Sequence, residues 1–434
     1  MSLILVDGIK DRPGTGGPKF PNGLHLPAGI GITGDGHINM AGVCTFSGNV
    51  TIGGTLTYED VTNIDSVGII TANTGINVVA NGINVQAGIL TAKNIIDASD
   101  AQYNTRVGGN AGNSFDGTNA THNTLIGYDA GTAITGGDRN TVVGSLAGDA
   151  LTTGSYNTAI GRDCGGGTNT GRSNVAMGYE TFVTNTTGDY NVALGYEALR
   201  ANTTASYNTA VGQGALRANT TGANNSAVGR NSLTLNTTGA NNDAFGAYAL
   251  DANTTGSFNN AFGRSALSSN TTGSQNTALG YGALFDNTAN DNVAVGNWAL
   301  QNNTTGSQNV GVGASALYSN TTASNNTAVG YNALLANTTG DQNAALGKGS
   351  LAANTTASNQ TAMGFNALTA NTTGAANSAF GSSALAANTT ANDNTAMGAG
   401  ALQANTTGYS NTAVGRMSLM TATTGSHNTA VGSS

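Results

Sequence analysis

Residues Asn208–Asn224 read NTAVGQGALRANTTGAN, and the next 17 residues, Asn225–Asn241, read NSAVGRNSLTLNTTGAN. The same pattern extends in both directions from this pair, from Asn104 to Ser434. It makes 20 units of 17 residues, with a two-residue insertion in the first unit, a one-residue deletion in the unit that starts at Asn276, and a last unit of seven residues. A short fixed period of this kind is typical of a solenoid, in which each unit forms one coil.

The unit can be written N-x-A-h-G-x-x-A-L-x-x-N-T-T-G-x-x, where h is a large apolar residue, and its positions are numbered here from 1 to 17. The glycine at position 5 occurs in all 20 units, from Gly108 to Gly432. Glycine at the end of a strand permits a positive φ or a close approach of two backbones, so we expect the first turn of the coil there. The N-T-T-G segment at positions 12–15 predicts the second turn.

Apolar residues recur at position 4 in every unit and, as leucine, at position 9 in most units. Because adjacent residues of a strand face opposite sides, we expect position 4 to fill the interior and the alanine at position 3 to lie where another backbone or chain comes close. Two interior residues per unit predict two short strands per coil. The fold class predicted is therefore all-β, a repetitive parallel β-roll or β-solenoid with 17-residue coils.

Asparagine occupies position 12 without interruption from Asn185 to Asn405. In a parallel solenoid, equivalent residues stack about 4.8 Å apart, so their amides are expected to form a hydrogen-bonded ladder along the axis. Position 1 predicts a second ladder, in which Gln360 is an amide substitute. The position 12 ladder is predicted from these residues: Asn185, Asn202, Asn219, Asn236, Asn253, Asn270, Asn320 and Asn337.

The composition favours a thin core and argues against several kinds of chemistry. Only 8% of the 434 residues are charged, the net charge is −8, and the 38% apolar content is mostly alanine, valine and leucine. Nucleic-acid binding needs clustered lysine and arginine, whereas the 14 here are scattered. The histidines (His25, His37, His122, His427) are far apart in sequence, and no glycine-rich run ends in Gly-Lys-Ser/Thr. We expect no enzyme activity, no cofactor and no metal site.

The first quarter of the chain differs from the array. All four prolines fall within residues 1–28, which predicts an extended N-terminal arm. Residues 29–103 contain short β-branched runs separated by glycine and asparagine, which predicts a β-stranded shaft, and residues 104–434 form the array. The two cysteines, Cys44 and Cys164, fit no redox or metal motif.

Residues Val50–Val78 read VTIGGTLTYEDVTNIDSVGIITANTGINV. This run resembles a segment that recurs in tail-fibre and other virion proteins of marine tailed phages, cyanophages in particular. The array resembles the NSVAIG-type repeats in the heads of trimeric autotransporter adhesins and the NTAIGxxAL arrays upstream of self-cleaving chaperone domains in phage fibres. These resemblances imply a homotrimeric fibre that is fixed to the virion through residues 1–28.

The repeat also suggests how copies would associate. The strip of alanines at position 3 would be an uncovered surface of small apolar side chains, which closed cyclic symmetry would cover. A homotrimer is therefore expected, with a monomer as the alternative.

Five aromatic residues predict a recognition surface: Tyr281, Phe285, Trp298, Tyr318 and Tyr331. They occur within four units around the single deletion, at positions 6, 7 and 10, which are expected to point outward. Aromatic faces on a rigid surface commonly stack on sugar rings, so glycan contact is one interpretation, and packing between protomers is the other. The repeated Asn-Thr-Thr is formally a glycosylation sequon, but its asparagine is expected to be structural.

The leading hypothesis is a structural fibre protein of a tailed-phage virion that spaces or presents a host-attachment surface. The alternative is a bacterial trimeric adhesin head, and the third is a glycan-degrading tailspike or an ice-binding solenoid. Expected partners are copies of itself, other tail or baseplate proteins through residues 1–28, and a host surface glycan or protein, with no nucleic acid and no membrane insertion. The apolar run at Leu3–Val6 is too short for a signal peptide, so we expect no export signal, and the resemblance to phage fibres implies a virion location. The ending NTAVGSS predicts a partner or a removed C-terminal folding domain that covers the last coil.

Overall fold

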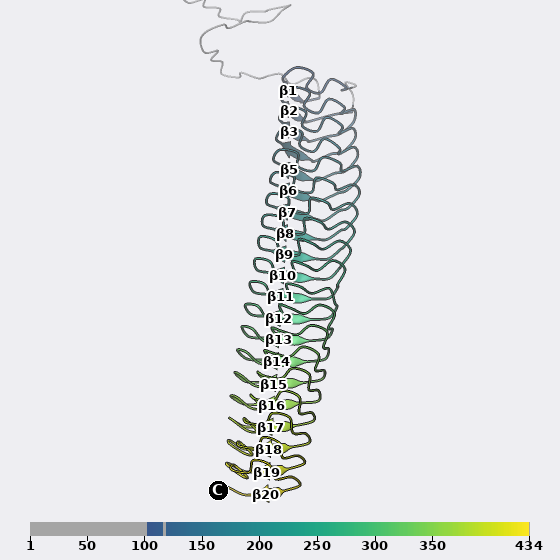
Figure 1. The fold of residues 1–434 in the computed structure, drawn as a ribbon. Coiled ribbons are helices and arrows are strands. Elements are labelled where there is room, and N and C mark those ends of the chain that lie inside the picture. Colours follow the sequence, from purple (N-terminus) through teal and green to yellow (C-terminus); the bar gives the residue numbers. More distant parts are fainter. Residues whose placement is uncertain (1–101, 116–118, 434) are drawn as a thin grey trace, which may run out of the picture. The chain divides into compact units, whose positions relative to one another are not determined.

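The computed structural model describes residues 102–115 and 119–433, and these residues form an all-β parallel solenoid of about 19 turns with 17-residue coils (Figure 1). No helix occurs within these described residues. The predicted fold class is confirmed at this level. The predicted arm (1–28) and all but the last two residues of the predicted shaft (29–103) lie outside the described residues.

Each coil contributes one strand of three residues, at positions 2–4 of the unit. The strands are β1 (Thr105–Val107), β2 (Thr124–Ile126), β3 (Thr141–Val143), β4 (Thr158–Ile160), β5 (Val175–Met177), β6 (Val192–Leu194), β7 (Thr209–Val211), β8 (Ser226–Val228), β9 (Asp243–Phe245), β10 (Asn260–Phe262), β11 (Thr277–Leu279), β12 (Val293–Val295), β13 (Val310–Val312), β14 (Thr327–Val329), β15 (Ala344–Leu346), β16 (Thr361–Met363), β17 (Ser378–Phe380), β18 (Thr395–Met397), β19 (Thr412–Val414) and β20 (Thr429–Val431).

Consecutive strands pair in parallel and in register, so that like positions of successive units lie side by side. Thr209 pairs with Ser226, Ala210 with Ala227 and Val211 with Val228, and the pattern holds across the deletion, where β11 pairs with β12. The single sheet therefore carries one column of equivalent side chains for each strand position.

The strand phase is the reverse of the one predicted. The middle residue, at position 3, is buried in every strand from β2 to β19, whereas position 4 is half-buried or exposed. Ala210 is fully buried and Val211 is not. The expectation that position 4 fills the interior was wrong. The asparagine at position 1 points inward, and because strand side chains alternate, position 3 must share its side.

The interior is filled by alanine at positions 3 and 8 and by leucine at position 9. Gly311, which occupies position 3 of its unit, shows how they meet: a Cβ placed there would lie 3.3 Å from the Leu300 Cδ1 of the preceding coil. The leucine at position 9 is an interior residue, as predicted. It does not belong to a second strand, because it lies in a turn with a positive φ, as at Leu216 (φ 50°). One strand per coil replaces the two expected.

The first coils fill the same interior with a different set of side chains. Leu125 and Val142 stand at position 3, where later coils have alanine, and each faces a glycine at position 9, Gly131 or Gly148. A Cβ on Gly131 would lie 2.9 Å from the Leu125 Cδ2. The larger residue on one wall is thus matched by the absence of a side chain on the other, which keeps the interior volume nearly constant.

The glycine at position 5 is required by conformation and by space. All 20 have a positive φ between 123° and 145°, a region that only glycine adopts readily. A Cβ on Gly212 would lie 2.6 Å from the carbonyl oxygen of Gly229 in the next coil. The predicted turn and close backbone approach are both present.

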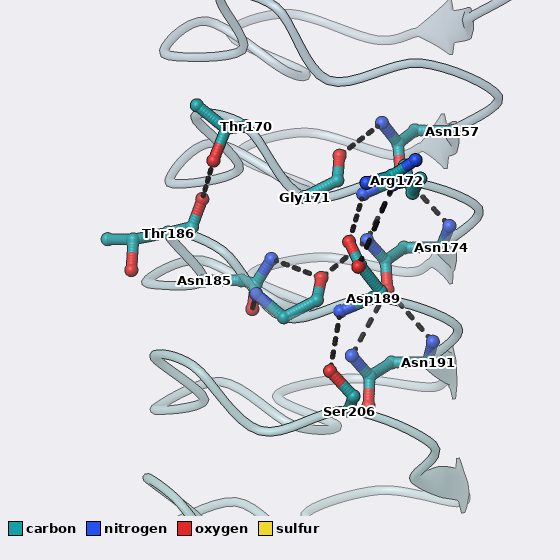
Figure 2. Close-up of polar contacts among 11 residues, drawn as sticks. Asn157, Thr170, Gly171, Arg172, Asn174, Asn185, Thr186, Asp189, Asn191 and Ser206 are labelled. Carbon is teal, nitrogen blue, oxygen red and sulfur yellow. Dashed lines mark hydrogen bonds and ion pairs between the residues drawn. The ribbon is translucent and has the colours of Figure 1, made fainter.

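The asparagines at position 1 close each coil and join it to the next (Figure 2). The Asn157 amide nitrogen donates to the Gly171 carbonyl, 2.9 Å away and near the end of the same coil. The Asn157 Oδ1 accepts hydrogen bonds from the backbone N–H and the side-chain amide of Asn174, at 3.0 and 3.2 Å. The backbone bond repeats between all neighbouring units from Asn104 to Asn428, with Gln360 acting as the amide substitute.

The asparagines at position 12 form a second buried column. The Asn236 amide donates to the Asn219 Oδ1 at 2.8 Å and to the Gly239 carbonyl at 2.9 Å. This column has two defects. The oxygens of Asn270, beside the deletion, and of Asn405, where Ala422 replaces the next asparagine, are buried without a hydrogen-bond partner.

Two further columns were not expected from the sequence. At position 16, serine, aspartate or asparagine accepts a hydrogen bond from the backbone N–H of the preceding coil, as Asp189 does from Arg172 (2.8 Å) and Ser206 from Asp189 (3.0 Å; Figure 2). At position 13, the threonine hydroxyl donates to the carbonyl of the next coil, as in Thr203 to Thr220 (3.0 Å). Most side-chain hydrogen bonding therefore runs along the axis.

We expect Gly212→Ala to destabilise the array far more than Gly214→Ala, although both change the same coil. At Gly212 (φ 131°) alanine would need a backbone conformation that is nearly closed to it and would clash with the next coil, at a cost of about 3 kcal/mol or more. At Gly214 (φ 67°) a Cβ would lie 2.5 Å from the Asn231 Oδ1, the end of a side chain that can move, and other coils place Tyr248 or Ser265 at this position. The cost there is about 1 kcal/mol. Urea unfolding followed by circular dichroism measures the difference; equal losses would contradict the assignment.

The defect at Asn405 predicts a stabilising substitution. In Ala422→Asn the new amide would supply the missing donor to the Asn405 Oδ1, which should raise the free energy of unfolding by about 1 kcal/mol. Asn236→Ala should lower it by roughly 1–3 kcal/mol, since it removes both bonds that its amide makes. Thr421→Asn, on the neighbouring exposed residue, is the control. No gain in Ala422→Asn over this control would contradict the ladder.

Candidate functional site

Most of the exposed tyrosines lie in two columns that flank the outward side of the strands. One column is at position 6 and the other at position 17. The exposed members are Tyr128, Tyr179, Tyr196, Tyr281, Tyr331 and Phe365 at position 6, and Tyr156, Tyr190, Tyr207 and Phe258 at position 17. Tyr103, directly before the first unit, is exposed at the place equivalent to position 17. Rings in consecutive coils stack, as in Tyr179–Tyr196 (5.7 Å between centroids) and Tyr190–Tyr207 (5.2 Å). Arginine or lysine in a neighbouring coil often covers a ring, as Arg162 covers Tyr179.

The five predicted recognition residues lie in three columns, at positions 6, 7 and 10 of the unit. Tyr281 (46% exposed) and Trp298 (42% exposed) are brought together, with ring centroids 6.0 Å apart and planes tilted by 53°. Tyr331 is exposed at position 6 and contacts Lys348. Phe285 and Tyr318, at position 10, are half-buried rather than fully exposed, and the coil that contains Gln301 lies between them.

Sequence reasoning missed the aromatic residues of the first half of the array. Tyr179, Tyr196, Tyr190 and Tyr207 recur at positions 6 and 17, so their column positions were readable from the period. Proximity in sequence drew attention to Trp298 and its neighbours, whereas in a solenoid it is the shared position in the unit that brings side chains together.

A charged hollow opens where the coil of Asn157 carries Gly166 and Gly167 at positions 10 and 11. Its volume is about 430 Å³, and it is lined by Leu146, Asp149, Ala150, Asp163, Gly166, Gly167, Glu180, Val183 and Arg200. Gly166 and Gly167 contribute backbone but no side chain to its wall. Arg200 reaches across one coil to pair with Glu180 at 3.0 Å.

The carboxylates of the hollow differ in their electrostatic surroundings. Burial raises the pKa of Asp149, and the nearby carboxylates of Asp163 and Asp129 add to the effect. A hydrogen bond from the Tyr179 hydroxyl lowers the pKa of Glu180, and the Arg200 guanidinium acts in the same direction. The arrangement suits ion pairing and hydrogen bonding to a polar ligand.

In the described part of the chain, the histidine side chains contact aromatic rings and the cysteine side chain is buried in the core. His122 stacks on Tyr103, with centroids 5.3 Å apart, and His427 contacts the edge of Tyr409 at 5.0 Å. Cys164 is fully buried at position 8, where most coils have alanine, and burial raises the pKa of its thiol to about 12. Within the described residues no group of three or more histidine, cysteine, aspartate or glutamate side chains is placed to hold a metal ion.

The Asn-Thr-Thr sequons fall inside the coil. Their asparagines from Asn185 to Asn405 are fully buried, and the amides are engaged in the position 12 column. A glycosylating enzyme has no access to these amides in the folded coil. The structural interpretation of the repeated asparagine is thus supported by its hydrogen bonds.

Among residues 102–115 and 119–433, no helix is long and apolar enough to cross a membrane. In comparisons with known proteins, no family model matches the chain, and no curated protein matches it.

Proposed function

We propose that this chain is a structural fibre protein of a tailed-phage virion, assembled as a homotrimer, that spaces or presents a host-attachment surface. The observation that supports this most is the uniform stack of in-register coils, in which equivalent side chains form continuous buried and exposed columns. At about 4.8 Å per strand, 19 steps give a rod roughly 90 Å long. Such a rod holds two points at a fixed distance, which is what a fibre shaft does.

The resemblance of residues 50–78 to tail-fibre segments supports the virion location and gives residues 1–28 the role of the attachment arm. The array resembles adhesin heads as well, so a bacterial trimeric adhesin head is the alternative. Both assignments use the coil stack as a spacer with an exposed recognition surface.

An enzyme or an ice-binding protein fits less well. A glycan-degrading tailspike needs paired carboxylates placed about a sugar, whereas Glu180 in the hollow is bound by Arg200. An ice-binding array needs threonine hydroxyls that face water in a regular plane. The position 13 threonines use theirs to join the coils, as in Thr220 to Thr237 (3.0 Å). The outward threonines of position 2 are replaced in 9 of 20 units and lie beside the apolar residues of position 4.

Antibodies raised against the array test the proposed location. On purified phage particles that contain the protein, gold-labelled antibodies should decorate the tail appendages in electron micrographs and should slow adsorption to host cells. Antibodies against the capsid serve as the control. Labelling of the surface of uninfected bacteria, with none on the particles, would overturn the virion assignment in favour of the adhesin.

Glycan contact by the Tyr281–Trp298 pair is a second candidate function, because the two exposed rings form a tilted aromatic surface with Arg264 beside Tyr281. Stacking of a sugar on an aromatic ring combines apolar contact with C–H interactions at the ring face.

This candidate predicts that the double variant Tyr281→Ala/Trp298→Ala binds host surface polysaccharide at least tenfold more weakly, at an unchanged unfolding temperature. Tyr409→Ala, an exposed ring distant in the array, should bind like the parent chain. Surface-immobilised polysaccharide and purified full-length protein suffice for the measurement. Equal binding by the double variant and the control would remove the pair as a glycan site.

A further inference from the structure

The large apolar residues of position 4 form a continuous column on the outside of the solenoid. Because every strand pairs in register with its neighbours, each position 4 side chain lies beside the next along the axis. The rings of Phe245 and Phe262 stack with centroids 4.9 Å apart and planes within 3°. Their outer faces remain in solvent, with Phe245 38% exposed and Leu279 49% exposed.

Strand propensity alone does not account for this column. Positions 2 and 4 both point outward from the same strands, and threonine is as good a strand former as valine. Threonine occupies position 2 in 11 of 20 units but position 4 in none. Position 4 holds only valine, isoleucine, leucine, methionine or phenylalanine. The two positions share a backbone conformation, so the difference reflects what the side chains at position 4 contact.

The column is large enough to serve as an interface. It is roughly 90 Å long and about 10 Å wide, on the order of 900 Å², which exceeds the apolar patches usual on monomers and matches one side of a standard protein interface. No residue at position 4 is charged, and Asp243 is the one charged residue at position 2. The tyrosines and arginines of the neighbouring position 6 column, such as Tyr196 and Arg264, have the composition typical of an interface rim.

We infer that the position 4 column is the surface through which copies of this chain hold one another. The side chains of the column repeat once per strand spacing over 20 coils, so a partner that contacts the whole column must have the same repeat. Another copy of this chain has it. The inference rests on the self-assembled fibre of the proposed function but not on its virion location. The position 4 column takes the place of the position 3 alanines as the predicted surface of association, because those alanines are buried inside the coil.

Charge placed on the column tests the inference. The full-length parent chain (42.9 kDa) should have a molar mass of about 129 kDa by light scattering after gel filtration. The triple variant Phe245→Lys/Phe262→Lys/Leu279→Lys should dissociate to about 43 kDa, because burying three lysines at a contact is costly. The matched control is Thr238→Lys/Thr255→Lys/Thr272→Lys, which places three lysines on exposed threonines of the opposite turn, and it should stay assembled.

A second variant guards against misfolding of the lysine variant. Phe245→Thr/Phe262→Thr/Leu279→Thr keeps good strand formers at the same positions and should retain the β-sheet circular dichroism of the parent, while self-association weakens at least tenfold. A parent chain of about 43 kDa would overturn the inference, as would threonine and lysine variants that assemble as tightly as the control. Assembly through position 4 in a protein that antibodies do not find on particles would leave the inference standing and remove the virion location.

Discussion

The hydrogen bonds of the buried asparagine at position 1 are the interaction on which the other features of the coil depend. Its amide nitrogen ties the start of a coil to the carbonyl near its end, as in Asn157 to Gly171, and its oxygen receives the backbone N–H of the next coil. These asparagines are buried, and a buried amide left unpaired is costly, so each coil must stack on the next to supply their hydrogen-bond partners. With position 1 inside, alternation puts position 3 inside and positions 2 and 4 outside.

Much of this fold could be predicted from the sequence. The period gave the coil, the glycine of position 5 marked a turn whose φ only glycine adopts, and the repeated asparagines indicated axial hydrogen bonding, which the bonds of Asn174 and Asn236 show. The phase of the strand was mispredicted, although the inward asparagine of position 1 and the alternation rule together require position 4 to face outward. Residue size was the misleading signal. A large apolar residue is usually placed in the core and a neighbouring alanine at a contact surface, but the interior of this coil is narrow and holds the alanine of position 3, with the larger residue of position 4 outside.

Other features had no clear sequence signal. Leucine at position 9 is a usual core residue and rarely adopts a positive φ, so its place in a turn could not be read from its type. Leu125 and Gly131 stand at positions 3 and 9, where later coils have alanine and leucine. This paired change can be understood only once positions 3 and 9 are known to face each other. At the surface, the pair of Tyr281 and Trp298 was found from the sequence, whereas the hollow beside Gly166 required knowledge of which columns adjoin.

The uniformity of the array limits where recognition can occur, since a repeated surface offers the same contacts at every coil. Position 4 exploits that repetition, and the aromatic columns and the hollow at Gly166 depart from it. A density map of the assembled full-length protein at side-chain resolution tests this account most directly. It should show one three-residue strand per coil, with Asn208 and Ala210 inside and Val211 at the contact between copies. Position 4 side chains pointing into the coil interior, with position 3 alanines on the outside, would contradict it.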